Sequence, residues 1–589
     1  MCGFLGCLDG DVAKSKAMAG LAHRGPDSSD EYSAGALYLR HYRLAILGTE
    51  ETAHQPMTSR DGNVILAFNG EIYNYCEIAS WMGQPGLADD GDTRVLVELL
   101  ARHGMARLDM LNGMFAIAAY FRPAREFYLV RDRFGVKPLY YCQADNALYF
   151  ASEIKSLRGL RPTPLDPERT RHYLDYGIYP GGTDTFFDGI RQVEAGTWVR
   201  RQNGAQEERR YFDLRAECGR LLEEKPDVDE YESLLEDAIR LRLRSDVPIS
   251  LHYSGGTDST ALLLKTKEVW GWDFPIAAFS MAFDEPAFDE STLAESYCAQ
   301  IGAQHHKVTL SAAEVPALAA QLHYFEDEPY GGIPTIAYYK LNMVEREKGY
   351  IVSIEGQGGD ETFGGYVYHA YMAMYDLARS GANPALLKML LQTYRVEPGQ
   401  AVAAAERLIA AGFQAHTDLT DLREPATARR PEMFVDWLKT IQLYDILSNK
   451  IPRTLRFNDR ASMACGREIR FPMLDYRVLA CGLAFSHEQK YAQGLSKAPL
   501  REIIRRHLQG VYAEPKRSVV TPQTQWLRRE LKDWAQERID VLRQSAFLPM
   551  EYFDRADAFY RDENPTNSFY IWQLINLSFF FDQPSAATH

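Results

Sequence analysis

Short stretches in which apolar and polar residues alternate dominate the first part of the chain. The strands that they predict are residues 36–40, 64–68, 116–121, 126–131, 139–142, 147–152 and 196–200. Turn-forming residues such as RDGN at 60–63 separate them, and a helical period covers 93–103. This pattern predicts a sheet-rich first domain with a few helices over residues 1–212.

The pattern changes after residues 213–228, a charged segment that contains Pro226 and lacks strand alternation. We interpret it as a linker. Beyond it, apolar strands are followed by amphipathic helices: 249–253 by 259–269, 276–282 by 292–301, 305–310 by 313–324, and a further strand covers 350–354. This order predicts a parallel sheet covered by helices in a second domain, residues 229–589. Helical patterns, for example 432–448 and 500–508, dominate the rest.

Composition narrows the class of function. A chain of 589 residues exceeds what one hydrophobic core usually supports, and its net charge of −15 argues against binding nucleic acid or an anionic membrane surface. Eight cysteines occur without CxxC pairs or metal-ligand spacing, and neither a leader nor a stretch of about 18 apolar residues is found. We therefore expect a cytoplasmic enzyme acting on small molecules.

Cys2 is the first candidate catalytic residue. If Met1 is removed, one residue carries both a thiol and an α-amine, and such an amine titrates at roughly pH 7.7–8.0. It can act as a base beside its own nucleophile. Taken alone, a cysteine at this position is more often without function.

A second candidate site is the segment 254–260 (SGGTDST), between a predicted strand and its helix. Glycines let backbone N–H groups approach an anion, and the following helix N-terminus favours negative charge. Asp258 is suited to hold a Mg²⁺ that bridges phosphate oxygens. No Gly-Lys-Ser/Thr follows, so the loop is not a Walker A motif, and a Gly-Gly turn alone is more often structural.

The loop matches the pyrophosphate loop of enzymes that cleave ATP to AMP and pyrophosphate, and nearly the whole chain resembles the glutamine-hydrolysing asparagine synthetases. The N-terminal motifs of this resemblance are CG at 2–3, HRGPD at 23–27, RLAI at 43–46, FNGEIYN at 68–74, GDT at 91–93, GMFA at 113–116 and RDRFGVKPLY at 131–140. The C-terminal motifs are GGDE at 358–361, FGGY at 363–366, DRASM at 459–463 and KAPLR at 497–501.

The resemblance implies an N-terminal αββα sandwich of the N-terminal-nucleophile type and a C-terminal α/β domain of the ATP-pyrophosphatase type. Cys2 would attack glutamine and release ammonia, with the side chain of Asn69 and the backbone N–H of Gly70 as oxyanion donors. The glutamine-binding residues would be Arg43, Asn69, Gly70, Glu71 and Asp92. Arg24 is expected to support the loop around the nucleophile.

At the second site the resemblance implies that ATP activates a carboxylate as an acyl-adenylate, which ammonia then attacks. Mg²⁺ would be held by Asp258 and Asp360, and a dry internal passage would join the two sites. The family also suggests a homodimer. The residues implied for ATP and pyrophosphate are His252, Ser254, Gly255, Gly256, Asp258, Ser259, Met281, Glu355, Gly356 and Lys497.

The sequence departs from the family in the acceptor site, where Gln357 replaces the glutamate of a usual Ser-Gly-Glu-Gly. Either Glu355 or Glu361 compensates and the acceptor is aspartate, or the acceptor is another carboxylate, as in secondary-metabolite or surface-polymer biosynthesis. Milder departures are Thr257 and His252. Three further alternatives are a β-lactam-forming cyclase, a non-catalytic metabolite-binding relative and a nucleic-acid-modifying enzyme. The presence of both complete sets of site residues argues against the first two, and the acidic composition argues against the third.

Overall fold

The computed structural model describes residues 2–582 except 17, 19, 49–52, 145, 161–162, 290, 414–431, 509–520 and 562–567. In this part of the chain, the N-terminal domain contains two six-stranded antiparallel sheets. The first runs β10 (Arg191–Gln192), β8 (Tyr140–Ala144), β9 (Ala147–Ala151), β1 (Gly3–Leu8), β3 (Leu37–Arg43) and β2 (Ser28–Ala34). The second runs β12 (Ala205–Arg210), β11 (Thr197–Gln202), β7 (Glu126–Arg131), β6 (Gly113–Phe121), β5 (Val64–Ile72) and β4 (Met57–Thr58).

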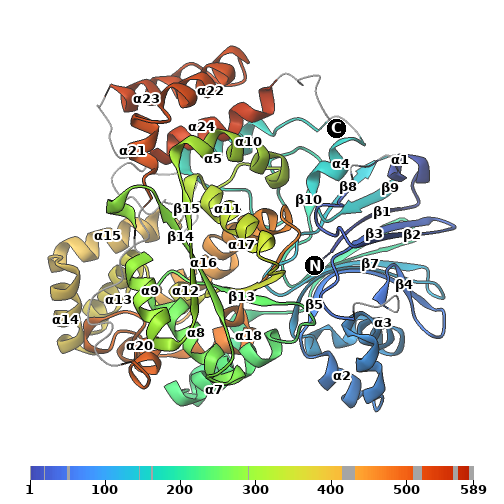
Figure 1. Ribbon diagram of the computed structural model, residues 1–589, viewed down its shortest axis with the longest axis horizontal. Helices are drawn as coiled ribbons and strands as arrows, with labels where there is room; N and C mark the ends of the chain where they lie inside the picture. Colours follow the sequence, from blue (N-terminus) through green and yellow to red (C-terminus); the bar gives the residue numbers. More distant parts are fainter. Residues whose placement is uncertain are drawn as a thin grey trace.

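The two sheets pack face to face, because alternate apolar side chains of both point into one core that contains Phe4, Leu39, Ile65 and Leu129. Helices cover the outer faces. They are α1 (Val12–Lys16), α4 (Ile154–Arg158) and α5 (Pro167–Tyr176) beside the first sheet, and α2 (Tyr75–Trp81) and α3 (Asp92–His103) beside the second. The predicted αββα sandwich is confirmed (Figure 1).

Five strands of this domain were not predicted from the pattern, namely β1, β2, β4, β10 and β12; the reason is clear for β1 and β2. All six residues of β1 are buried, so the strand shows no alternation of apolar and polar positions. Strand β2 lies at the edge of its sheet, is mostly exposed, and consists largely of polar residues. Neither β1 nor β2 shows alternation of apolar and polar residues, because neither strand has one solvent-exposed face and one buried face.

The segment predicted as a linker carries helix α6 (Leu214–Glu224). Its first turn is capped by Asp213, whose carboxylate accepts a hydrogen bond from the backbone N–H of Arg215 at 2.9 Å. Cys218 and Leu221 are buried against the second domain, next to α18 (Tyr476–Ala484). The connection between the domains is therefore a packed helix.

The second domain is built on the predicted parallel sheet. Its strands follow the spatial order β15 (Gln304–Leu310), β14 (Ala277–Phe283), β13 (Ile249–His252), β16 (Val352–Ile354) and β17 (Glu468–Arg470). Ala278 faces the core with α7 (Val228–Arg242) and α8 (Thr257–Trp270), whereas Phe279 faces α11 (Ile333–Glu347) on the other side. Helices α9 (Ser291–Ile301) and α10 (Val315–Glu326) complete the strand-helix units.

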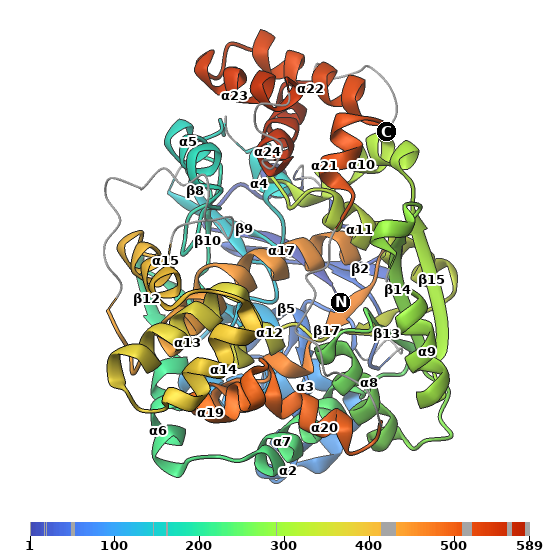
Figure 2. The same cartoon turned by 90° about the vertical axis from the view of Figure 1, so that its left-hand side faces the viewer.

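Two further helical groups extend this domain. The first comprises α12 (Gly359–Phe363), α13 (Val367–Ser380), α14 (Pro384–Tyr394), α15 (Pro398–Ala410), α16 (Trp437–Leu447), α17 (Lys450–Met463), α19 (His487–Lys490) and α20 (Ala498–Arg505). The second comprises α21 (Gln523–Arg528), α22 (Lys532–Gln544), α23 (Glu551–Tyr560) and α24 (Ser568–Ser578), which lie over α5 of the first domain and α10 of the second (Figure 2). No helix in the described ranges combines the length and apolarity that a membrane crossing needs.

The packing predicts a matched pair of stability effects within α13. Met372 is fully buried and Val367 is 51% exposed. Met372→Ala should lower the free energy of unfolding by about 2–5 kcal/mol because it leaves a cavity. Val367→Ala should change it by less than about 0.5 kcal/mol. Urea unfolding of the two full-length variants beside wild type checks this, and equal effects would contradict the packing described.

Candidate active sites

Cys2 stands directly before β1, and contacts from two other segments hold it in place. Its backbone N–H donates to Oδ1 of Asn69 at 3.2 Å, and Nε of Arg24 donates to its carbonyl oxygen at 3.1 Å. The side chain is 7% exposed, and burial raises the pKa of its thiol. The backbone groups on both sides of the thiol are therefore fixed by polar partners.

Asn69 and Gly70 lie on β5 beside this cysteine. The amide nitrogen Nδ2 of Asn69 is buried and has no hydrogen-bond partner among the described residues, whereas its Oδ1 accepts from the backbone N–H of Cys2. Gly70 has φ 147°, and a Cβ there would lie 1.9 Å from the carbonyl oxygen of Met114. Only glycine fits this position. An unused amide donor therefore lies next to the cysteine.

The predicted glutamine-binding side chains gather around the same point. Asp92 opens α3, accepts from the backbone N–H of Ile72 at 3.0 Å, and has its pKa raised by burial to about 6. Burial and the neighbouring Asp92 raise the pKa of Glu71 well above its usual range. Arg43 is buried too, and its guanidinium donates to the backbone carbonyls of Leu47 and Gly48.

The second site lies where β13 meets α8. Its loop is closed by hydroxyl groups: Oγ of Ser254 lies 3.2 Å from Oγ of Ser259 and accepts from the backbone N–H of Gly256 at 3.3 Å. Gly255 has φ 72°, in the region that favours glycine. Gly356 packs against this loop, since a Cβ there would lie 3.3 Å from Cβ of Asp258.

The side chain of Lys497 contacts both this loop and the segment after β16. Its ammonium contacts Asp258 and lies 2.6 Å from Oδ1 of Asp360. Although burial opposes it, the two carboxylates raise the pKa of Lys497, so the amine stays charged. The backbone of Gly365 closes over the group, because a Cβ there would lie 1.8 Å from Oδ1 of Asp360. Two carboxylates and one ammonium therefore meet at the carboxyl edge of the sheet, where ligands bind in open α/β folds.

His252 is the last residue of β13, and Glu355 directly follows the neighbouring strand β16 at the same edge. Nε2 of His252 is 2.8 Å from Oε2 of Glu345, and Nδ1 is 3.7 Å from Oε2 of Glu355. Against the effect of burial, these two carboxylates raise the pKa of His252 to about 9. The imidazole is therefore a buried cation at neutral pH.

Glu355 is fixed by three neutral donors. Its Oε2 accepts from the hydroxyl of Tyr338 at 2.7 Å and from Nδ2 of Asn458 at 3.0 Å, and its Oε1 accepts from Nε2 of Gln357 at 3.0 Å. The amide at position 357 thus points its donor at a carboxylate two residues earlier in the chain.

The two remaining predicted residues differ in burial. Glu361 is buried, accepts from the hydroxyl of Tyr366 at 2.6 Å, and has its pKa raised by burial and by Asp360 to about 7. Met281 lies on β14 and is 37% exposed.

Glu345, Tyr338 and Asn458 belong to this site and were missed by the sequence reasoning. Tyr338 and Glu345 are two of several buried polar residues of α11, and Asn458 is one of several on α17. The one signal for them was His252, since a histidine in an apolar strand needs a buried polar partner. The presence of His252 does not reveal where in the sequence its polar partner lies.

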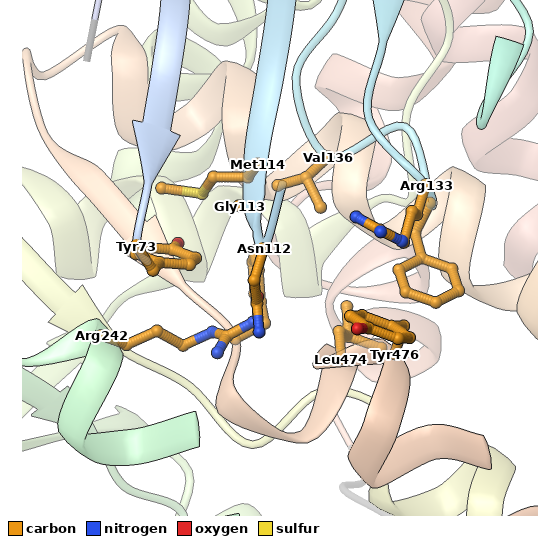
Figure 3. Close-up of a pocket in the computed structure, with 11 residues that line it drawn as sticks. Tyr73, Asn112, Gly113, Met114, Arg133, Val136, Arg242, Leu474 and Tyr476 are labelled. Atoms are coloured by element: carbon orange, nitrogen blue, oxygen red, sulfur yellow. The ribbon is translucent and has the colours of Figure 1, made fainter. Parts of the chain in front are cut away.

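A cavity of about 20 Å³ lies between the two domains (Figure 3). Its lining residues are Tyr73, Asn112, Gly113, Met114, Arg133, Phe134, Val136, Arg242, Phe471, Leu474 and Tyr476. On its wall, Oδ2 of Asp475 accepts from Nδ2 of Asn112 at 2.7 Å and from Nη1 of Arg242 at 3.1 Å. The domains therefore meet through buried polar contacts beside a water-sized space.

An amino-terminal nucleophile sandwich and a parallel sheet with a phosphate-type loop, joined in one chain, define a glutamine amidotransferase fused to a nucleotide-dependent synthetase. A family model described as Glutamine amidotransferase domain matches residues 1–212, and one described as Asparagine synthase matches residues 230–581. The chain belongs to the asparagine synthase family and is a glutamine-hydrolysing ligase of that type.

The chain is similar in sequence to named proteins over most or part of its length. Asparagine synthetase (glutamine-hydrolyzing) 1 of Bacillus subtilis is 26% identical over 98% of this chain and 95% of its own length. A putative asparagine synthetase (glutamine-hydrolyzing) of Mycobacterium bovis is 28% identical over 89% of this chain and 87% of its own. Amidase chry2 of Gibberella zeae is 28% identical over 59% of this chain and 54% of its own.

The buried His252 predicts a pH-dependent stability. Its pKa is raised in the folded state to about 9, so its contribution is fully present below the unfolded value of about 6.5 and is lost as the pH rises through 9. The free energy of unfolding should fall by about 3 kcal/mol over this interval through His252. Urea unfolding at pH 6.5 and 9.5 measures the fall. His252→Gln should flatten it, and an unchanged slope would contradict the assignment.

Proposed function

We propose that the chain hydrolyses glutamine at Cys2 and uses the ammonia to amidate aspartate through an acyl-adenylate, releasing asparagine, AMP, pyrophosphate and glutamate. The observation that carries this proposal is the hydrogen bond from the backbone N–H of Cys2 to Oδ1 of Asn69, together with the buried Nδ2 of Asn69, which has no hydrogen-bond partner among the described residues. The similarity to an asparagine synthetase over 98% of this chain supports it.

In the first reaction the thiol of Cys2 attacks the side-chain amide carbon of glutamine, the C–N bond breaks, and ammonia leaves. Water then hydrolyses the resulting thioester to glutamate and the free thiol. This role requires removal of Met1, so that the α-amine of Cys2 acts as the base and Asn69 Oδ1 orients it. Nδ2 of Asn69 and the N–H of Gly70 would donate to the oxyanion. Asp92 and Glu71 would bind the α-ammonium group of glutamine, and Arg43 its α-carboxylate.

In the second reaction the carboxylate of the acceptor attacks the α-phosphorus of ATP, and the bond to pyrophosphate breaks. Ser254, Gly255, Gly256 and Ser259 would bind the pyrophosphate, and Lys497 would balance the charge that develops on phosphate oxygens. His252, Met281 and Gly356 would line the adenosine, with Glu355 beside it. Ammonia then attacks the acyl carbon, and AMP leaves.

Asp258 and Asp360 suit a Mg²⁺ ion, because both carboxylates converge on one point, which the Lys497 ammonium contacts. Carboxylate oxygens are ligands that Mg²⁺ prefers, usually with substrate phosphates. A bound ion would neutralise charge on the pyrophosphate.

The identity of the acceptor depends on the residues around position 357. Gln357 lacks a carboxylate, but its amide donates to Glu355, and Glu361 follows in the same segment on α12. This favours compensation by a neighbouring acid and hence aspartate. The second candidate, another carboxylate, is favoured by the amidase-named relative of Gibberella zeae. We also propose the domain boundaries: residues 1–212 form the glutaminase domain, residues 229–589 form the synthetase domain, and residues 213–228 connect them.

Cys2→Ala should abolish glutamine-dependent pyrophosphate release and leave ammonia-dependent release within about twofold of wild type, because the two sites are chemically separate. Coupled assays for glutamate and pyrophosphate measure both activities in one preparation. Equal loss of both would count against the assignment, as would intact methionine at the start of the active protein by mass spectrometry.

A panel of carboxylic acids tests the acceptor. With ammonia as nitrogen source, aspartate should give the highest rate of pyrophosphate release, and succinate, which lacks the α-ammonium group, should be slower by at least about tenfold. Amide formation, followed by mass spectrometry, must match pyrophosphate. Turnover of another acid without turnover of aspartate would replace aspartate in the proposal, and no turnover of any acid would refute the synthetase half.

A further inference from the structure

A large cavity lies between the two domains, apart from both candidate sites. Its volume is about 370 Å³, which is within the usual range of small-molecule sites. It is bordered by strands and loops of the first domain, by the start of α6, and by α16 and α17 of the second domain. The residues proposed above for glutamine, ATP, Mg²⁺ and the acceptor all lie in the described ranges, and none of them borders this cavity. The cavity is therefore a separate candidate for a ligand.

The charged lining of this cavity is mainly positive. Seven arginines and five carboxylates of the described residues border it. The chain as a whole has a net charge of −15, so this excess of arginine is a local departure from the rest of the protein. A concave surface with an excess of one sign of charge concentrates ions of the opposite sign. The lining therefore favours an anion.

The carboxylates of the lining already have partners. Oε1 of Glu194 lies 2.7 Å from Nη2 of Arg210, and Oε2 of Glu328 lies 2.6 Å from Nη1 of Arg456. The other three are Asp184, which pairs with Arg169, Asp459, which pairs with Arg24, and Asp213, which caps α6. Among the described residues, the acids of the cavity thus pair with two of its seven arginines.

Four arginines of the lining have no carboxylate within ion-pair distance in the described part of the chain. They are Arg131, Arg133, Arg215 and Arg453. Arg131 donates to backbone carbonyls, for example that of Gly135 at 2.9 Å. Arg133 also donates to carbonyls, and its buried Nε has no hydrogen-bond partner among the described residues. Since buried cations normally pair with an anion, these arginines favour an added negative charge.

Arg133 and Arg453 belong to different domains. Arg133 borders both this cavity and the small one shown in Figure 3. The guanidinium of Arg453, on α17, packs on the ring of Tyr179 at 5.6 Å, and that of Arg456 packs on the same ring at 5.4 Å. Tyr179 lies in the first domain, between α5 and β10. A guanidinium that stacks on a ring keeps its N–H edge free for a carboxylate or phosphate.

The N-terminus of α17 adds to the positive potential. Ser448, Asn449 and Pro452 border the cavity, and no side chain caps this helix. The first N–H groups of a helix carry partial positive charge. An anion in the cavity would therefore meet the end of α17 and the guanidinium of Arg453 one turn further on.

We propose that this cavity binds a small multivalent anion, a polycarboxylate or a phosphate, between the two domains. The anion would neutralise Arg131 and Arg133 of the first domain and Arg453 of the second. Because its ligands come from both domains, binding should stabilise their docked arrangement. This inference does not depend on the reactions proposed above.

Calorimetric titrations of the full-length protein with citrate and with inorganic pyrophosphate test the site. Ionic strength is held constant, so that screening is equal throughout. At least one of the two anions should bind wild type at this site with a Kd between about 1 µM and 1 mM. Arg453→Gln should weaken that binding by about tenfold or more, because it removes a charged donor. Arg453→Lys keeps the charge without the planar fork and should lose less.

Arg505→Gln is the matched control, because Arg505 is an exposed arginine on α20 outside the cavity, and it should leave the binding unchanged. Pyrophosphate has a second expected site at the loop 254–259, so its binding counts for this cavity only where Arg453→Gln removes it. Dependence on Arg453 for citrate alone assigns polycarboxylates, and dependence for pyrophosphate alone assigns phosphates.

Melting curves complete the test. Without anion, each variant should melt as wild type does. With the anion, wild type and Arg505→Gln should be stabilised and Arg453→Gln should not. If wild type binds neither anion with a Kd below about 10 mM, or if Arg453→Gln binds as wild type does, the inference is wrong. Either result would leave the proposed function intact.

Discussion

The buried guanidinium of Arg24 is the contact on which the arrangement of both domains depends. It binds the carbonyl of Cys2, the carboxylate of Glu153 in the same domain and, through a two-donor fork, Asp459 in the other domain. Arg460 pairs with Glu153 in turn. Removing one partner of such a buried group typically costs about 3–5 kcal/mol. The position of the nucleophile and the docking of the domains are thus set by the same charges.

The two candidate sites obtain their precision in different ways. In the first domain, backbone groups of Cys2 are fixed by Asn69 and Arg24, and the positive φ of Gly70 lets β5 approach β6 closely. In the second domain, the sheet supplies an edge at which loops from β13 and β16 meet, and charges of opposite sign lock the side chains. Rigid strands hold both sites, and the helices around them supply the partners.

Much of the fold followed from the pattern of residues. Four of the five strands of the parallel sheet, together with α8, α9 and α10, were predicted from short apolar runs and helical periods, whereas β17 and α11 were not predicted. The predictions were less complete where burial removed alternation, as in β1, and where a charged segment formed a capped helix, as in α6. The motifs named Cys2, Asn69 and Asp92 as candidates for one site, and these residues lie close together in the structure, while their roles stay a prediction.

By itself the sequence determined the two-domain plan, the chemistry-bearing motifs and the departure at Gln357, because these depend on local periodicity and residue type. Only the tertiary structure decided that Gln357 donates to Glu355, that His252 is a cation held by Glu345, and that Asn458 and Asp459 face different sites. Such pairings join residues up to hundreds of positions apart. They depend on which charges are buried together, a property of the packed chain that no local pattern records.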